Sequence, residues 1–557
     1  MSNGISRPKT RIVARLSAPL MALATAGLAT PVLATTPSHY GVTISKHTTV
    51  NMAFANGIYS ATADNAYLSI TDLKSALAAG NVEVTTGNGA GGDEMGDLHV
   101  NAGFTWSSKH ALTLDAYHSI FVSSAVVDAG KGALTLTNDD GGTGGTFTYG
   151  AGGSITIWDV QDTLKINGVH FLLDASIQSL AGDILAKPSG DFALANSYDA
   201  SKDGGYNGSP IPTEFAGTFE GLGNTISNLT IVSGAGLFYE ATGVLRDVHL
   251  VKVAVTGSST DGIPTGALVG WELGSVEGAS SSGSVTNNNA SNPYPVGGLV
   301  GDGNNMADCS STATVQSNYA EGIGGLVGVV GTVSNSSASG TVAGAATSQL
   351  EAGGLTGAAS TIVNSYATGT VTGTGEGSEK TYLGGLEGWS GGAVTGSFAT
   401  GAVTGPPKAS VGGLIGYGYS GAITNSYSTG NVAVGATSNV GGLIGELPDN
   451  ESASIATSYS TGAPSGGANG WIGGLLGLDN TKAGCGCFTD AVWDTTTSGI
   501  TNPAQGAGFP PNEPGITGLS TAQLQSALPA GFDPTVWAES PSINNGLPYL
   551  IANPPPK

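Results

Sequence analysis

The sequence predicts an all-β protein built as a right-handed parallel β-helix, and a regular repeat together with the composition carries this prediction. Gly accounts for 91 of 557 residues and only 10% of residues are charged. Val, Ile, Thr and Tyr are common, and these residues favour strands. Disordered chains are instead rich in charge and poor in β-branched residues. Within the repeat, no segment keeps the 3.6-residue period of a helix.

The repeat is a Gly-(Gly/Ala)-Leu-x-Gly unit that recurs eight times, with its leucines 31, 27, 29, 31, 28, 29 and 32 residues apart. Its leucines are Leu268, Leu299, Leu326, Leu355, Leu386, Leu414, Leu443 and Leu475. One period therefore makes one coil, and coils stack about 4.8 Å apart. The leucines then form an apolar column that a stack buries and a single coil does not. We expect the glycines at corners, where φ is positive or backbones pack closely.

A second phrase, with the pattern Asn-Ser-Tyr-x-Thr-Gly, lies between these units. Its second position is small in seven coils: Ala279, Cys309, Ser336, Ser365, Ser397, Ser426 and Ser458. Its third position is aromatic in four successive coils: Tyr366, Phe398, Tyr427 and Tyr459. Neighbouring residues on a strand point to opposite faces. One column is thus crowded inside the coil and the other has room, and the pattern does not say which; Cys309 is expected to be a packed small residue.

These four aromatic residues are the candidate ligand-binding residues of the sequence. Stacked aromatic rings on a polar β surface bind sugar rings. The alternative is that the rings stabilise the coil stack by packing on one another. Both interpretations remain open at this point.

Several segments resemble a known group of proteins. The repeat resembles the GLUG motif of large bacterial surface proteins, and residues 215–231 match the phrase that precedes such repeats. Residues 104–136 are similar to filamentous haemagglutinin-like proteins, and residues 545–550 resemble the segment that closes these arrays. The resemblance implies an exported, surface-associated β-helix linked to adhesion. An Asn-Pro-Asn-Gly secretion signature is not evident, which leaves the export route open.

The chain divides into four parts. Residues 1–34 read as a signal peptide, because four basic residues precede an apolar stretch and cleavage after Ala34 is plausible. Residues 35–200 form a β-rich, haemagglutinin-like region, in which a helix is expected at residues 71–79 with Thr71 as its N-cap. Residues 201–480 hold the GLUG-repeat β-helix. Residues 481–557 form a C-terminal capping region, with a helical capping box that begins at Ser520.

Charge and cysteines exclude several classes of function. The formal net charge is −23, so the protein repels phosphate backbones and nucleic acid is not an expected partner. The three cysteines make no disulfide framework. Cys485 and Cys487 stand one residue apart, which is poor disulfide geometry, so we expect them to be incidental small residues. No metal site and no cofactor are expected.

Catalytic motifs are not evident in the sequence. There is no His-Glu-x-x-His, Gly-x-Ser-x-Gly or phosphate-binding loop. Four acids of the repeat region are dispersed across coils and are expected to be isolated, solvated charges: Asp247, Asp302, Asp308 and Glu387. Acids in the Gly-rich turns at residues 93–97 and 139–140 suit Ca²⁺, but exposed turn carboxylates are the favoured interpretation. We therefore expect a protein that is not an enzyme.

The predicted function is an exported, adhesin-like surface protein that binds glycans, matrix or other cells. Its expected partners are glycans, host or matrix proteins and an outer-membrane secretion partner. Its expected location is the cell surface, associated with a Gram-negative outer membrane, or the secreted fraction. One alternative is a β-helix carbohydrate enzyme with a cleft on residues 201–212. The other is a purely structural stalk or biofilm component.

Overall fold

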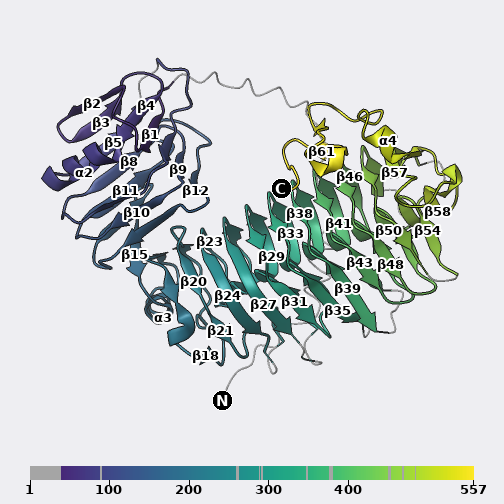
Figure 1. Ribbon diagram of the computed structural model, residues 1–557. Coiled ribbons are helices and arrows are strands. Elements are labelled where there is room, and N and C mark those ends of the chain that lie inside the picture. The colour runs from purple at the N-terminus through teal and green to yellow at the C-terminus, as the bar shows by residue number, and fades with distance from the viewer. Residues whose placement is uncertain are drawn as a thin grey trace.

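The computed structural model describes residues 39–557 apart from 88–90, 259–261, 288, 290–292, 347–348, 376–379, 450–452, 467–468, 483–484 and 557. The described chain is a β-solenoid of about 15 turns with 48% strand and 7% helix, which confirms the predicted fold class. Figure 1 shows it bent into two arms, an N-terminal block and a longer stack of coils. The predicted signal segment lies outside the described residues. No helix of the described part is long and apolar enough to cross a membrane.

The N-terminal block is itself built from parallel strands around its own hydrophobic core. The sheet used below, here called the N-terminal sheet, has the order β12 (Phe147–Tyr149), β9 (Ile120–Val122), β6 (Leu98–Val100), β1 (Val42–Ser45) and β4 (Ala66–Ser69). Two further walls contain β5 (Val82–Thr85), β8 (Leu112–Asp115), β11 (Ala133–Thr137) and β14 (Thr163–Ile166), and β7 (Phe104–Trp106), β10 (Ala125–Asp128) and β13 (Ser154–Ile157). Apolar residues alternate inward along each strand.

One helix packs into the core of this block, and a second begins the core of the longer arm. Helix α2 (Ile70–Ala79) confirms the expected helix, but Ser69 rather than Thr71 is its N-cap. The Ser69 hydroxyl accepts from the Thr71 N–H, because capping needs an acceptor placed before the first turn. Helix α3 (Ile177–Ala186), which the sequence analysis did not identify, begins the core of the longer arm with three buried residues.

From β28 (Val296–Gly297) onward, each coil of the longer arm has strands on three faces that pair with the same strands of the next coil. The coil around Leu386 contains β40 (Thr381–Gly384), β41 (Glu387–Thr395), β42 (Phe398–Ala399) and β43 (Val403–Gly405). The next contains β44 (Ser410–Gly412), β45 (Ile415–Gly418), β46 (Gly421–Thr424), β47 (Tyr427–Ser428) and β48 (Val432–Val434). All eight repeat leucines are fully buried, so the predicted apolar column is confirmed.

The glycines of the repeat are required by close backbone contact rather than by positive φ. A Cβ on Gly384 would overlap the carbonyl oxygen of Glu387, and one on Gly385 would overlap that of Gly413 in the next coil. A Cβ on Gly388 would meet the backbone of Ala352 in the preceding coil. The strands before and after the Gly-Gly pair therefore lie against each other at a corner that no larger residue fits.

The Asn of the second phrase forms the corner that leads into the aromatic strand. Asn364 and Asn425 both have φ near 48°, and Gly396 takes φ 61° at the same point of the coil between them. Asn and Gly tolerate this left-handed conformation better than other residues. Each coil thus turns at a single residue, and the following Ser and Tyr are placed on opposite faces.

The small column lies inside the coil and forms a ladder of hydrogen bonds. The Ser397 hydroxyl donates to the Thr395 carbonyl at 2.9 Å and accepts from the Ser365 N–H at 3.1 Å. The same pair of bonds recurs at Ser336, Ser365, Ser426 and Ser458, all of them buried. Cys309 continues the ladder as a buried thiol that donates to Ala307. The expectation that Cys309 is a packed small residue is confirmed.

The C-terminal region folds back onto the last coils. After β57 (Ala491–Asp494), β58 (Ala507–Phe509) and β59 (Ile516–Leu519), helix α4 (Thr521–Leu524) begins with the predicted capping box at Ser520. Strands β60 (Trp537–Ala538) and β61 (Tyr549–Leu550) pair antiparallel. The segment that begins at Ser520 and contains α4, β60 and β61 is here called the cover. It appears in yellow above the end of the solenoid in Figure 1.

The expectation for Cys485 and Cys487 is wrong, because the two form a disulfide. Gly486 between them has φ 70°, a conformation that glycine adopts without steric cost. This turn brings the two Cα atoms to 5.2 Å, within the usual range for a disulfide. The sequence spacing alone did not indicate that the backbone would bend so tightly.

Candidate functional site

The four candidate aromatic residues form one continuous stack. Ring centroids are 4.9 Å apart for Tyr366 and Phe398, 4.8 Å for Phe398 and Tyr427, and 5.0 Å for Tyr427 and Tyr459. The ring planes agree within 6° in every pair. Parallel strand pairing places each residue directly over the next, so the coil stack sets the ring spacing.

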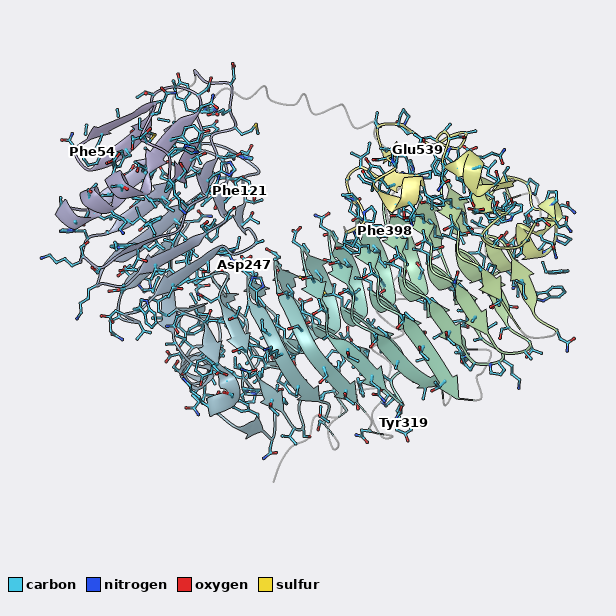
Figure 2. The ribbon with its side chains drawn as sticks, in the orientation of Figure 1. Phe54, Phe121, Asp247, Tyr319, Phe398 and Glu539 are labelled. Atoms are coloured by element: carbon cyan, nitrogen blue, oxygen red, sulfur yellow. A yellow bond between two sulfur atoms is a disulfide. The ribbon has the colours of Figure 1, made fainter. Side chains whose placement is uncertain are left out.

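The cover buries most of this aromatic stack. Phe398, Tyr427 and Tyr459 have no exposed surface, and only Tyr366 is partly exposed. The stack shares a hydrophobic cluster with cover residues Leu524, Phe532, Trp537, Leu547 and Leu550. In Figure 2, Phe398 lies below the segment that carries Glu539. Three of the four rings therefore have no open surface in this structure, because a distant segment packs on them.

Polar contacts fasten the cover to the stack. The Tyr459 hydroxyl donates to the Pro548 carbonyl at 2.6 Å and accepts from the Asn544 amide at 2.8 Å. The Trp537 indole N–H donates to the Asn425 side chain at 3.2 Å. Ligand binding by the aromatic stack stays a prediction, and it requires the cover to leave.

Other aromatic residues remain accessible on a different corner of the coil. Tyr382 and Tyr417 stack with centroids 4.6 Å apart, and Trp389 and Tyr419 stack at 5.2 Å. Tyr419 is 46% exposed and the other three are partly exposed. These four residues are here called the aromatic corner: Tyr382 lies on the strand before the Gly-Gly turn, Trp389 and Tyr417 lie on strands after it, and Tyr419 directly follows β45. The corner thus holds two accessible pairs of stacked rings, and register pairing places Trp389 of one pair beside Tyr417 of the other.

Carboxylates stand next to the aromatic corner in the same columns. Glu351 is the register partner of Tyr382, and Glu446 is that of Tyr417. The Glu446 carboxylate accepts from the hydroxyl of Ser410 at 2.5 Å and from the amide of Asn439 at 3.0 Å. Rings and hydrogen-bonding groups therefore lie side by side along one edge of the solenoid.

Burial changes the acidity of two groups at this corner. Burial raises the pKa of Glu351 to about 7, against a smaller opposing effect of the Gln349 hydrogen bond. Burial and then the nearby Glu446 charge raise the pKa of the Tyr417 hydroxyl to about 12. The Tyr417 hydroxyl therefore stays protonated and able to donate a hydrogen bond at neutral pH.

The dispersed acids are not all solvated, which corrects the sequence expectation. Asp302 and Glu387 are buried, and burial raises the pKa of Asp247 to about 8. Arg246 pairs with the fully buried Glu220 at 2.6 Å. Register pairing stacks Glu220, Arg246 and Glu277 in successive coils. The sequence signal for this cluster was the period, which brings charges one coil apart together.

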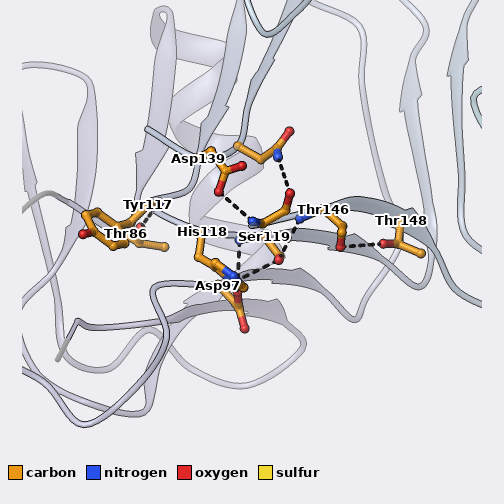
Figure 3. Close-up of polar contacts among 10 residues, drawn as sticks. Thr86, Asp97, Tyr117, His118, Ser119, Asp139, Thr146 and Thr148 are labelled. Atoms are coloured by element: carbon orange, nitrogen blue, oxygen red, sulfur yellow. Dashed lines mark hydrogen bonds and ion pairs between the residues drawn. The ribbon is translucent and has the colours of Figure 1, made fainter. Parts of the chain in front are cut away.

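The N-terminal block holds a polar network around Asp97, His118 and Ser119 (Figure 3). Asp97 Oδ1 lies 2.7 Å from His118 Nδ1, and the Ser119 hydroxyl lies 3.0 Å from the same nitrogen. A Ser-His-Asp triad needs the carboxylate and the hydroxyl on different ring nitrogens. This network therefore organises the ends of β6 and β9 and does not activate a nucleophile.

Side-chain hydrogen bonds hold the loop that the sequence offered for an enzyme cleft. In residues 201–212, Asp203 accepts from the hydroxyls of Tyr198 at 2.5 Å and Tyr206 at 2.7 Å. Among the residues that the structure describes, no group of three or more His, Cys, Asp or Glu is arranged to hold a metal ion. The turn acid Asp139 instead accepts from the Gly145 N–H at 2.7 Å.

Comparisons with known proteins agree with the repeat. The family model described as the GLUG motif matches residues 409–433, a segment with one Gly-Gly-Leu unit and one Asn-Ser-Tyr phrase. The chain thus carries a GLUG motif.

Halomucin of Haloquadratum walsbyi is 31% identical over 205 residues. The match covers 32% of this chain and only 2% of halomucin. A candidate immunoglobulin A1 protease from Bacteroides ovatus, whose crystal structure is known, covers 69% of this chain and 92% of its own at 17% identity and a TM-score of 0.33. A TM-score this low does not establish a shared fold.

Proposed function

We propose that the protein is an exported, adhesin-like surface protein whose solenoid binds glycans, matrix components or other cells. The observation that carries the proposal is the aromatic corner, where Tyr382, Trp389, Tyr417 and Tyr419 remain accessible on a rigid stack. The GLUG motif and the similarity to a short part of halomucin support a surface or secreted protein.

The chemistry of the corner suits shallow contacts with sugars. Aromatic rings offer apolar faces to the C–H groups of a sugar ring, and the neighbouring Glu446 and Asn439, both partly exposed, offer hydrogen bonds to hydroxyls. The strands of the coil stack hold these groups in place, apart from Tyr419 directly after β45, so little conformational entropy is lost on binding.

We further propose that the protein reaches the cell surface of a Gram-negative organism with the help of an outer-membrane secretion partner. The basic and apolar N-terminal segment supports export across the inner membrane. The haemagglutinin-like character of residues 104–136 supports passage across the outer membrane with such a partner. Fractionation of cells that express the full chain, with protease treatment of intact cells, tests this location.

The binding proposal is tested with an array of glycans and matrix proteins probed by the purified full chain. The test variant is Trp389→Ala with Tyr419→Ala. The control is Trp158→Ala, since Trp158 is 63% exposed in the N-terminal block and far from the repeats in sequence. Selective binding that the corner variant loses and the control keeps supports the proposal. An array without any binding by the wild type overturns it and favours a structural stalk.

A carbohydrate-active enzyme is the alternative function. The cluster of Glu220, Arg246, Asp247 and Glu277 joins acids to an arginine, the combination that a uronate substrate requires. Against it, Glu220 is fully buried and held by Arg246. Release of reducing ends or unsaturated products from acidic and neutral polysaccharides would favour the enzyme.

A further inference from the structure

The outer face of the N-terminal sheet carries a column of rings with one interruption. In spatial order the column contains Tyr67 on β4, Thr43 on β1, His99 on β6, Phe121 on β9 and Thr148 on β12. Parallel pairing places each residue beside the next, about 4.8 Å away. The small Thr43 therefore leaves a space between Tyr67 and His99.

The preceding outward position repeats this arrangement. There Gly41, which has no side chain, directly precedes β1, while Asp97 directly precedes β6. The result is a cavity of about 400 Å³ over β1, with Gly41, Thr43, Tyr67, Glu94, Asp97 and His99 among its lining residues. Gly41 before β1 and Thr43 within it thus lie between larger residues of β4 and β6, and together they form a trough.

The stacking geometry indicates what shape the trough accepts. His99 and Phe121 lie with centroids 4.7 Å apart and planes within 9°, so their faces point along the direction in which strands stack. The second face of His99 is turned toward the trough. Tyr67 is two strands from His99, about 9.6 Å away. One ring-shaped group fits between them and extends the stack.

Two carboxylates with fixed positions supply the polar wall. The Glu94 carboxylate accepts from the backbone N–H of Gly41 at 2.7 Å and of Asn65 at 3.2 Å. One oxygen of Asp97 accepts from His118 and from the Ser119 N–H at 3.0 Å (Figure 3). A carboxylate offers about four acceptor positions, so both retain capacity for hydroxyl donors.

We propose that this trough binds one uncharged pyranose ring of a glycan. The site adds a second contact to the proposed adhesin and rests on that function only for its biological role. A pyranose has the ring shape for the gap beside His99 and the hydroxyls for Glu94 and Asp97. The two carboxylates, in a chain of net charge −23, repel uronates and sialic acids.

The test is saturation-transfer NMR of the full chain with the methyl glycosides of glucose, galactose, mannose and N-acetylglucosamine. Methyl glucuronide and adenosine are the comparators. We expect transfer to at least one neutral glycoside and none to the comparators. Absence of transfer to every neutral glycoside overturns the proposal, and so does equal transfer to glucuronide or adenosine.

Variants locate the binding. Thr43→Trp fills the trough without removing its walls, and His99→Ala removes the stacking face; we expect each to weaken binding at least tenfold. Thr148→Trp is the matched control, because it adds the same bulk in the same column on the other side of Phe121. Circular dichroism checks that all three fold. Unchanged binding in both trough variants overturns the proposal.

Failure of this site and failure of the adhesin are distinguishable. If the chain still binds the array but the trough variants leave the NMR signals unchanged, the trough proposal is overturned and the adhesin proposal is not. Absence of binding in both experiments overturns both. Hydrolysis of a glycoside during the NMR measurement overturns the binding role and favours the enzyme.

Discussion

The hydroxyl of Tyr459 donates to the carbonyl oxygen of Pro548, 89 residues later in the chain, at 2.6 Å. Tyr427 is stacked directly on Tyr459, yet its buried hydroxyl has no hydrogen-bond partner among the described residues. Two identical residues in one column therefore differ in what their hydroxyls do. At Tyr459 the cover is held through the ring hydroxyl, whereas at Tyr427 it contacts only the ring, and its nearest polar contact in that coil is the bond from Trp537 to Asn425.

This difference predicts opposite effects for the same substitution. Tyr427→Phe removes an unpaired buried hydroxyl and gives this position the side chain of its neighbour Phe398. The free energy of unfolding should stay unchanged or rise by about 1 kcal/mol. Tyr459→Phe breaks two hydrogen bonds to the cover and should lower it by about 1–3 kcal/mol. Urea unfolding of both variants is the measurement, and equal effects would contradict the assignment.

The buried serine ladder predicts that removal of one of its hydroxyls lowers the stability of the protein. Ser397→Ala leaves the buried Ser365 N–H without its acceptor, so we expect a loss of about 1–3 kcal/mol in the free energy of unfolding. Faster hydrogen exchange of the Ser365 amide should accompany it. Ser339→Ala, at an exposed position nearby, is the control and should change little. Cys309→Ser should be tolerated, since serine occupies this column in the next five coils.

The apolar column and the inner ladder were accessible to sequence reasoning because a solenoid repeats one residue environment per period. Leu386 and Ser397 recur at the same spacing, so periodicity alone indicates that they stack. Which face held the serines was not decided by the pattern. It follows from the left-handed turn at residues such as Asn364, which orients the next two side chains.

The remaining features depend on contacts that have no period. Trp537 covers Tyr427 from a segment more than a hundred residues away, and no repeat marks that pairing. The trough over β1 arises in a block whose coils are irregular, so the alignment of Thr43 with His99 was not visible in the sequence. The Cys485–Cys487 pairing depended on the φ of Gly486.

Removal of the cover's central ring tests whether the aromatic stack binds ligands. Trp537 is buried against Tyr427 and Tyr459, so Trp537→Ala should destabilise the cover by about 3–5 kcal/mol. Hydrogen exchange should accelerate in residues 519–550 but not around Leu299, because solenoid coils contact only their neighbours. New glycan binding by this variant, lost when Tyr427 is also changed to Ala, would support binding by the stack; its absence would count against it.

The buried Glu351 predicts a pH dependence of stability with a defined sign. Burial raises its pKa from an ordinary 4.5 to about 7, so its neutral form stabilises the fold below the ordinary value and this contribution is lost as pH rises through 7. Glu351→Gln keeps the neutral shape, so wild type and variant should be alike at pH 4, below the ordinary pKa, and the variant more stable at pH 8 in urea unfolding. Asp533→Asn is the control of opposite sign, because hydrogen bonds from Thr535 lower the pKa of Asp533. A variant at Glu351 that gains nothing at pH 8 would show that this carboxylate is solvated in the folded protein.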